Sequence, residues 1–212
     1  MRVTQVLKNE HRVIEVVLDC VEKLAEQTQK SRVLDRDSAE KIVDFIRSFA
    51  DGCHHGKEES HLFVALEAEG ASRESGPVGM MLHEHELGRA LVKQMADNIV
   101  GASKGDEASL SSYINGAVGY VQLLRAHIQK EDGILFPLAD DMLSDEVFEK
   151  LSEDFEHVES HHMGEGTHQK YLDLAAALAK KFGVDAGPLA GHGSCGCAHK
   201  KSTDATEENH AA

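Results

Sequence analysis

The sequence is poor in proline, aromatic residues and basic residues. Only 3 of its 212 residues are proline, none is tryptophan, and aromatic residues make up 5%. Because proline interrupts the interior of a helix, its scarcity favours a helical protein. The 22 basic residues face 37 acidic ones, which is a formal charge of −15. A chain of this charge lacks a phosphate-binding surface, so we expect no nucleic-acid partner.

Long hydrophobic runs are also absent from the sequence. No stretch reaches the roughly 18 apolar residues of a membrane-spanning helix. The N-terminal segment MRVTQVLKNEHRVIE is charged and amphipathic, unlike a signal peptide. We therefore expect no membrane partner and a cytoplasmic location.

The four cysteines do not have the spacing of a disulfide-stapled secreted domain. Cys20 and Cys53 lie far apart on predicted helices, whereas Cys195 and Cys197 form a CGC near the end of the chain. We predict that Cys53 is a buried structural thiol, with a redox role as the alternative.

Apolar residues recur at helical spacing, and no useful length of strand-like alternation is present. The expected helices are 4–29, 38–69, 78–100, 110–139, 144–160 and 168–182. The second helix is expected to have its N-cap at Asp37 or Ser38. Short connections place successive helices antiparallel. The sequence therefore predicts an all-α, up-and-down four-helix bundle at 1–142, a C-terminal helical extension at 143–183 and a disordered tail at 184–212.

Fourteen histidines are present, and two of them open a repeated motif. Residues 54–66 read HHGKEESHLFVAL and residues 127–139 read HIQKEDGILFPLA. The two copies share a His, a Lys three positions later, a Glu four positions later, and Leu-Phe at eight and nine. A His and a Glu four residues apart lie on one face of a helix. The repetition therefore predicts that two helices each supply half of one site.

In the second copy, the His and the Glu lie inside the apolar seam of their helix. His127 and Glu131 continue the helical spacing of Leu124 before them and Ile134 after them. Burying an unpaired carboxylate costs several kcal/mol. One interpretation is a buried His–Glu pair, or a local drift that exposes both residues. The other is a metal site in the bundle interior, where imidazole and carboxylate ligands suit iron or manganese and a carboxylate can bridge two ions.

The first copy contains two His–Glu pairs at this spacing. The ungapped match selects His54 and Glu58, whereas the apolar spacing of the helix selects His55 and Glu59. A helix can bulge near a metal site, which weakens the spacing argument. We favour His54 and Glu58 as ligands, and keep His55 and Glu59 as alternative ligands or as groups that hold the ligands in place.

Single histidines on the first and third helices are further candidates. His11 lies one turn after Leu7 on the apolar face, and His85 lies one turn after Met81 on the inner face of LHEHELGRAL. A lone histidine on an apolar face is usually a core residue, but the two motif copies favour ligation here. His83 points elsewhere and is expected at the surface or behind the ligands.

Four blocks, in the order NEHRVIEVVL, CHHGKEESHLF, LHEHELGRAL and HIQKEDGILFP, resemble the hemerythrin-like, or HHE cation-binding, domain family. The resemblance covers about residues 4–140. It implies a four-helix bundle around two non-haem iron ions with an oxo or hydroxo bridge; the ligand types also suit manganese. By motif it implies the terminal ligands His11, His54, His85 and His127 and the bridging carboxylates Glu58 and Glu131.

One position departs from the oxygen carriers of that family, which have HxxxH on the third helix. Here Met81 stands four residues before His85. The missing imidazole puts reversible oxygen transport in doubt, because the ligand set decides that chemistry. Candidates for a further ligand, or for a residue close behind the ligands, are Asp132, Glu159, His161 and His162. A surface helix that is merely rich in histidine is the alternative for residues 157–168.

The tail also contains metal-binding residue types. His192, Cys195, Cys197 and His199 lie within eight residues of one another. They predict either a metal-scavenging tail or a solvated linker.

These observations predict a di-iron protein that senses or responds to oxygen, nitric oxide, peroxide or the iron level. The expected partner is therefore a small diatomic molecule or peroxide. One alternative is a di-iron enzyme that removes peroxide or nitric oxide or repairs iron centres. Another is oxygen binding or storage, or generic cation binding. The residues do not decide whether the protein is an enzyme.

Overall fold

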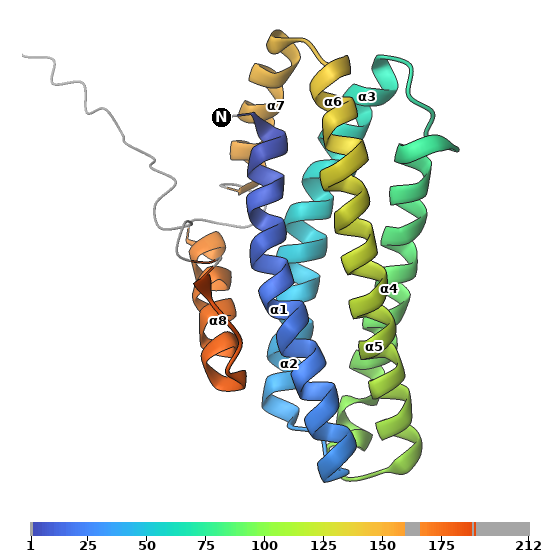
Figure 1. Cartoon of the computed structure of the whole chain (residues 1–212), viewed down its shortest axis with the longest axis vertical. Helices are drawn as coiled ribbons and strands as arrows, with labels where there is room; N and C mark the ends of the chain where they lie inside the picture. The colour runs from blue at the N-terminus through green and yellow to red at the C-terminus, as the bar shows by residue number, and fades with distance from the viewer. Residues whose placement is uncertain (1, 160–165, 188, 190–212) are drawn as a thin grey trace, which may run out of the picture.

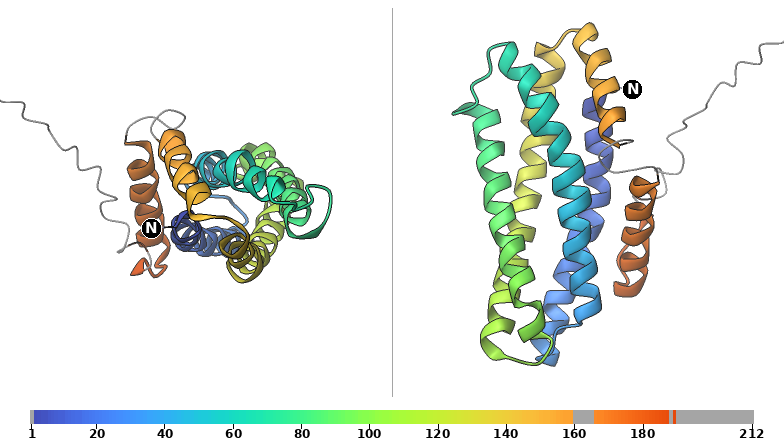
Figure 2. Two further views of the ribbon diagram at one scale, coloured as in Figure 1. Left: turned by 90° about the horizontal axis from the view of Figure 1, so that it is seen from above. Right: turned by 180° about the vertical axis from the view of Figure 1, so that it is seen from behind.

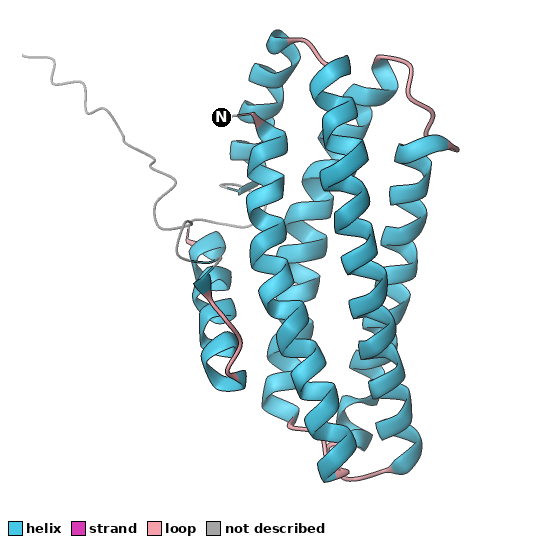
Figure 3. Cartoon of the chain, viewed as in Figure 1, coloured by secondary structure: helices cyan, strands magenta, loops and turns pink. Residues whose placement is uncertain are grey.

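The computed structural model describes all residues except 1, 160–165, 188 and 190–212. In the described residues no strand is present, and the predicted all-α class is confirmed (Figure 3). The helices are α1 (Val3–Ser31), α2 (Arg36–Phe45), η1 (Ile46–His55), η2 (Glu58–Leu62), α3 (Phe63–Ala68), α4 (Gly76–Ala102), α5 (Glu107–Lys130), η3 (Glu131–Leu135), α6 (Phe136–Met142), α7 (Asp145–His157) and α8 (Thr167–Phe182). None of these helices combines the length and the apolar character needed to cross a membrane.

Four long rods lie side by side and form the body of the molecule (Figures 1 and 2). The first rod is α1, the second runs from α2 to α3, the third is α4, and the fourth runs from α5 to α6. α1 packs on α5, α5 on α4, and α4 on α2. Short loops reverse the chain between successive rods, so the predicted up-and-down four-helix bundle is confirmed.

The second rod begins slightly earlier than predicted. Asp35 is the N-cap of α2, and its side chain accepts a hydrogen bond from the backbone N–H of Ser38 at 3.4 Å. The predicted N-cap at Asp37 or Ser38 is therefore wrong. Asp35 takes this role because its carboxylate reaches one of the free N–H groups of the first turn.

Both rods that carry the repeated motif change their helical winding at the motif. η1 and η2 are π-helical segments of the second rod, and η3 is a π-helical segment of the fourth. A π-helical turn holds more residues than an α-helical turn, so it moves side chains around the helix axis. As a result His54 and His55 are both buried, with 1% and 5% of their surfaces exposed.

A polar layer divides the apolar core into two clusters. Along α1, Leu7 belongs to one cluster and Ile14 to the other, and His11 lies between them. The fourth rod has the same order, with Leu124 and Leu135 in different clusters on either side of the motif. The histidines and glutamates of the motif therefore lie across the middle of the bundle, sealed by apolar residues on both sides.

α7 and α8 lie outside the four rods (Figure 2). α7 packs on α1 and η2, and its Phe148 and Phe155 belong to the core cluster that contains Leu7. α8 packs on α1 and α2 through Tyr171 and Leu178, which belong to the other cluster. The predicted C-terminal helical segments are therefore present and extend the two cores. Most of the predicted tail lies outside the described residues.

Candidate metal centre

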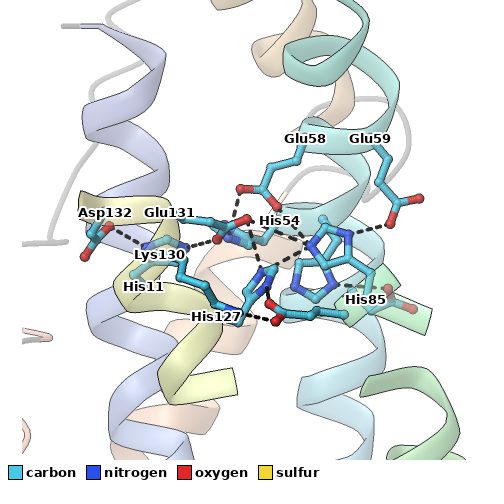
Figure 4. Close-up of polar contacts among 12 residues, drawn as sticks. His11, His54, Glu58, Glu59, His85, His127, Lys130, Glu131 and Asp132 are labelled. Carbon is cyan, nitrogen blue, oxygen red and sulfur yellow. Dashed lines mark hydrogen bonds and ion pairs between the residues drawn. The ribbon is translucent and has the colours of Figure 1, made fainter. Parts of the chain in front are cut away.

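The polar layer holds five histidines and two glutamates, each with 5% or less of its surface exposed. They form two groups, in each of which the candidate ligand atoms lie within 4.8 Å of one another. The two-imidazole group consists of His11, His54, Glu58 and Glu131. The three-imidazole group consists of His55, Glu58, His85 and His127. All six residues predicted as ligands therefore meet at one place (Figure 4).

Glu58 and Glu131 lie between the two groups. Each carboxylate presents one oxygen to an imidazole of each group. The distances are 3.6 Å for Glu58 Oε1 to His54 Nε2, 3.6 Å for Glu58 Oε2 to His85 Nε2, 3.1 Å for Glu131 Oε2 to His11 Nε2 and 3.1 Å for Glu131 Oε1 to His127 Nε2. Carboxylates placed in this way are suited to bridge two neighbouring cations.

Each of the five imidazoles has a carboxylate on its Nδ1 atom. The contacts are His11–Asp132 at 2.8 Å, His54–Glu10 at 2.9 Å, His55–Asp51 at 3.4 Å, His85–Glu59 at 2.7 Å and His127–Glu84 at 3.0 Å. Because a carboxylate can only accept, Nδ1 carries the proton and donates it. This leaves the lone pair on Nε2, and metal-ligating histidines in proteins are oriented in the same way.

Several atoms that face the interior have no hydrogen-bond partner in the described protein. They include Nε2 of His11 and His54 and both carboxylate oxygens of Glu58 and Glu131. Burial, together with repulsion from Glu131, raises the pKa of Glu58 well above its usual value. Leaving such groups unpaired is costly unless a cation binds them. The imidazole and carboxylate ligands fit a hard or borderline cation such as iron or manganese.

In the two-imidazole group the pKa values of the two histidines are shifted in opposite directions. The pKa of His11 is raised to about 9, because Asp132 and Glu131 outweigh the burial that would otherwise lower it. The pKa of His54 is lowered to about 4, mainly by burial. His54 is thus in the neutral form that binds metals, whereas a cation would have to displace the second ring proton of His11.

The two halves of the bundle repeat the same contacts. In each half, a glutamate directly before a histidine of the site accepts hydrogen bonds from the histidine and the lysine of the motif. The equivalent residues are Glu10 and Glu84, His11 and His85, His54 and His127, Lys57 and Lys130, and Glu58 and Glu131. The duplicated motif therefore belongs to a larger duplicated unit of two helices.

Other contacts cross from one half to the other. The carboxylate directly after each motif glutamate accepts a hydrogen bond from a histidine of the opposite half. Asp132 accepts from His11, and Glu59 accepts from His85. The motif phenylalanines also stack on these rings. The stacked pairs are Phe136 with His11, with ring centroids 5.4 Å apart, and Phe63 with His85, at 5.9 Å. The site is therefore an approximate two-fold arrangement in which each half supports the ligands of the other.

His55 interrupts this two-fold arrangement, because Ile128 stands at the equivalent place in the second half. The structure does not require a choice between His54 and His55, since the π-helical turn brings both rings into the interior. Met81, one turn before His85, is 2% exposed and belongs to an apolar cluster, so it offers no ligand. On this side of the site His55 supplies the third imidazole. Glu59 does not belong to either group and lies behind His85.

The remaining candidates lie outside both groups. Glu159 accepts a hydrogen bond from Lys57 at 3.0 Å. Neither residue belongs to the two groups. His83 is exposed on α4. His161 and His162 lie outside the described residues, as do the histidines and cysteines of the tail.

Three carboxylates that contact the candidate ligands were not predicted from the sequence: Glu10, Asp51 and Glu84. A signal for two of them was present, because a glutamate directly precedes a histidine in both NEH and HEH. Asp51 stands four residues before His55, a spacing at which two side chains on a helix meet.

Glu10, Cys53 and His168 form a third set of side chains that could hold a metal ion. Lys57 is fully buried beside this set, and its ammonium group donates to Glu10 and Glu159. The lysine therefore already supplies the positive charge that a cation would bring. Cys53 is fully buried, as predicted, and burial raises the pKa of its thiol to about 12. We interpret this set as a buried ion-pair cluster beside a structural thiol.

The fold and the site define a helical-bundle protein with two adjoining groups of side chains that could hold cations. The chain belongs to the hemerythrin family, since the Hemerythrin HHE cation binding domain matches residues 2–139. One protein of Mycobacterium bovis and two of Mycobacterium tuberculosis strains, all named as uncharacterised, are similar to it. Each is 24% identical over 178 residues, which cover 84% of this chain and 69% of the relative. No solved structure matches the chain significantly.

Proposed function

We propose that this protein binds two non-haem iron ions in the polar layer and responds to a small ligand such as oxygen, nitric oxide or peroxide. The observation that supports this proposal is the pair of buried groups that share Glu58 and meet at Glu131. Both groups offer imidazole nitrogens and carboxylate oxygens without a thiolate, a ligand set that favours iron or manganese over softer metals.

The two groups differ in the number of nitrogen ligands that they offer. The three-imidazole group has one more nitrogen than the two-imidazole group, and the additional one comes from His55. With Glu58 and Glu131 counted in both, the two-imidazole group offers four residues and the three-imidazole group offers five. A cation with fewer protein ligands has more room for a small molecule. Bound iron would supply one-electron chemistry and an open coordination position, and we place this position in the two-imidazole group.

Residues around the two-imidazole group hold its protons and exclude water. Asp132 accepts from His11 Nδ1 and is itself held by the guanidinium group of Arg12. Phe136 covers one face of the His11 ring, and Leu7 is fully buried in the adjoining cluster. These contacts hold the ring of His11 with its Nε2 atom facing a dry site, where electrostatic interactions are strong.

The test is the metal content and the optical spectrum of the full chain, purified without oxygen and reconstituted with ferrous iron. We expect two iron ions per chain and a charge-transfer absorption that appears in air and changes when nitric oxide or peroxide is added. A double variant, Glu58→Ala with Glu131→Ala, should lose both ions. A wild-type chain that takes up no iron under these conditions would contradict the proposal.

The same preparation distinguishes the alternative functions. Steady-state consumption of peroxide or nitric oxide by the iron form would assign an enzyme, whereas a spectral change without turnover would assign a sensor. Zinc or manganese bound as tightly as iron, with no spectral response to any small ligand, would indicate a generic cation-binding role.

A further inference from the structure

A pocket of about 120 Å³ lies between η1, α4 and α5, on the side of the three-imidazole group. His55 and His85 form part of its lining. Ile46, Val92 and Tyr120 contribute apolar surface to the rest. Cavities only slightly larger than this one accept a molecule with the bulk of a single aromatic ring.

A glycine on α4 leaves space in this pocket. A Cβ atom built on Gly88 would lie 3.7 Å from Cε2 of Tyr120 and 3.9 Å from Cδ2 of Leu123. Both are ordinary contact distances, so a methyl group at this place would strain nothing. Gly88 is therefore a place where the pocket can be made smaller without disturbing the helix.

Arg47, an exposed residue of η1, also lines the pocket. It forms no ion pair or side-chain hydrogen bond with any other residue that the structure describes. The other seven arginines each pair with at least one carboxylate: Arg2, Arg12, Arg32, Arg36, Arg73, Arg89 and Arg125. In a chain with 37 acidic residues, an unpaired guanidinium beside a pocket is a ready partner for a carboxylate.

The carboxylate of Asp51 also lines the pocket, but its charge is already engaged. Asp51 Oδ1 accepts from Arg89 Nε at 2.9 Å and lies 3.4 Å from His55 Nδ1. Arg47 therefore remains as the charged group of the pocket that is free to bind a ligand.

We propose that this pocket binds a small organic monoanion, a compact apolar or aromatic body with one carboxylate. The carboxylate pairs with Arg47, and the body lies against Ile46, Val92 and Tyr120. Binding requires no cation and so goes beyond the proposed function. The ligand also lies beside His55 and His85, so its binding changes the absorption spectrum of the iron-loaded protein.

The test compares benzoate with benzyl alcohol, which has the same ring but no charge. Both are titrated into the metal-free full chain and followed by ligand-observed NMR. We expect benzoate to bind about tenfold more tightly, because a charge-assisted hydrogen bond contributes this much. Arg47→Gln should abolish the preference. Arg36→Gln, which changes an exposed arginine on the same rod, should keep it. Gly88→Ala should weaken both probes.

Three outcomes would overturn the proposal: equal affinities for the two probes, no binding of either probe to the wild type, or an equal effect of Arg36→Gln and Arg47→Gln. The last outcome would show only general attraction of anions to surface charge. Iron content is measured on the same preparations. A chain that binds benzoate selectively but takes up no iron would count against the proposed function and leave the pocket in place.

Discussion

The ring of His55 lies almost flat against the ring of His85, with centroids 3.8 Å apart and planes at 15°. His85 has a counterpart in the other half of the bundle, namely His11. His55 has none, because Ile128 takes its place there. A single additional imidazole therefore makes the two cation groups unequal.

The His55→Ile variant should bind one of its two cations more weakly. We expect a loss of about 100-fold or more at the three-imidazole group, since loss of a residue that only supports a ligand already costs 10–100-fold. The fold should survive, because isoleucine already occupies the equivalent place in the second half. A metal titration followed by calorimetry measures both sites. His83→Ala, on the exposed face of α4, is the control, and equal weakening of both cations would contradict the prediction.

The Glu84→Gln variant should weaken cation binding without removing a ligand. Glu84 accepts from His127 Nδ1 at 3.0 Å and from the ammonium group of Lys130. An amide holds the imidazole less strongly than a carboxylate, so affinity at the three-imidazole group should fall about 10–100-fold. Glu86→Gln is the matched control, because Glu86 is an exposed neighbour on α4 that contacts Arg89. Unchanged affinity in Glu84→Gln would refute the role of this carboxylate.

Lys57→Met should destabilise the protein far more than the equivalent change in the other half. Lys57 is fully buried and paired with Glu10 and Glu159. Its loss leaves the buried carboxylate of Glu10 without this cation, at a cost of about 3–5 kcal/mol. Lys130 is one-third exposed, and solvent can replace it, so Lys130→Met should cost about 1 kcal/mol or less. Urea unfolding of both variants measures the difference, and similar free energies of unfolding would contradict it.

The attachment of α8 should depend on pH through Asp35. Burial alone would raise the pKa of Asp35, but hydrogen bonds from Lys181 and Ser38 lower it. A carboxyl group with a lowered pKa stabilises the fold above its unfolded pKa of about 3.9. That contribution is lost as the pH falls through the folded value.

The measurement compares the wild type with Asp35→Asn by chemical unfolding between pH 6 and pH 2. Because Asp35 and Lys181 are both partly exposed, the wild type should be more stable by about 1 kcal/mol or less at the upper pH. The advantage should shrink below about pH 4. A difference that stays constant over this range would show that the carboxylate charge is not involved.

The helical order and the candidate ligands were accessible from the sequence, because both depend on local spacing. Apolar residues at helical intervals predicted the four rods, and the repeated motif identified His127 and Glu131 as polar residues inside an apolar seam. That His54 and His55 both point inward was not accessible in this way. On a regular α-helix, adjacent residues such as His54 and His55 point about 100° apart, so only one of them faces a given direction. Whether the helix winds as a π-helix depends on packing.

The sequence by itself determined which segments are amphipathic helices and which polar residues interrupt their apolar faces, since periodicity is a property of neighbouring residues. Only the tertiary structure decided which carboxylate holds which imidazole. Asp132 reaches His11 across 121 residues of chain, and Glu59 reaches His85 across 26. These partners meet because buried polar atoms must be paired, and the packing of the four rods determines which of them come within reach.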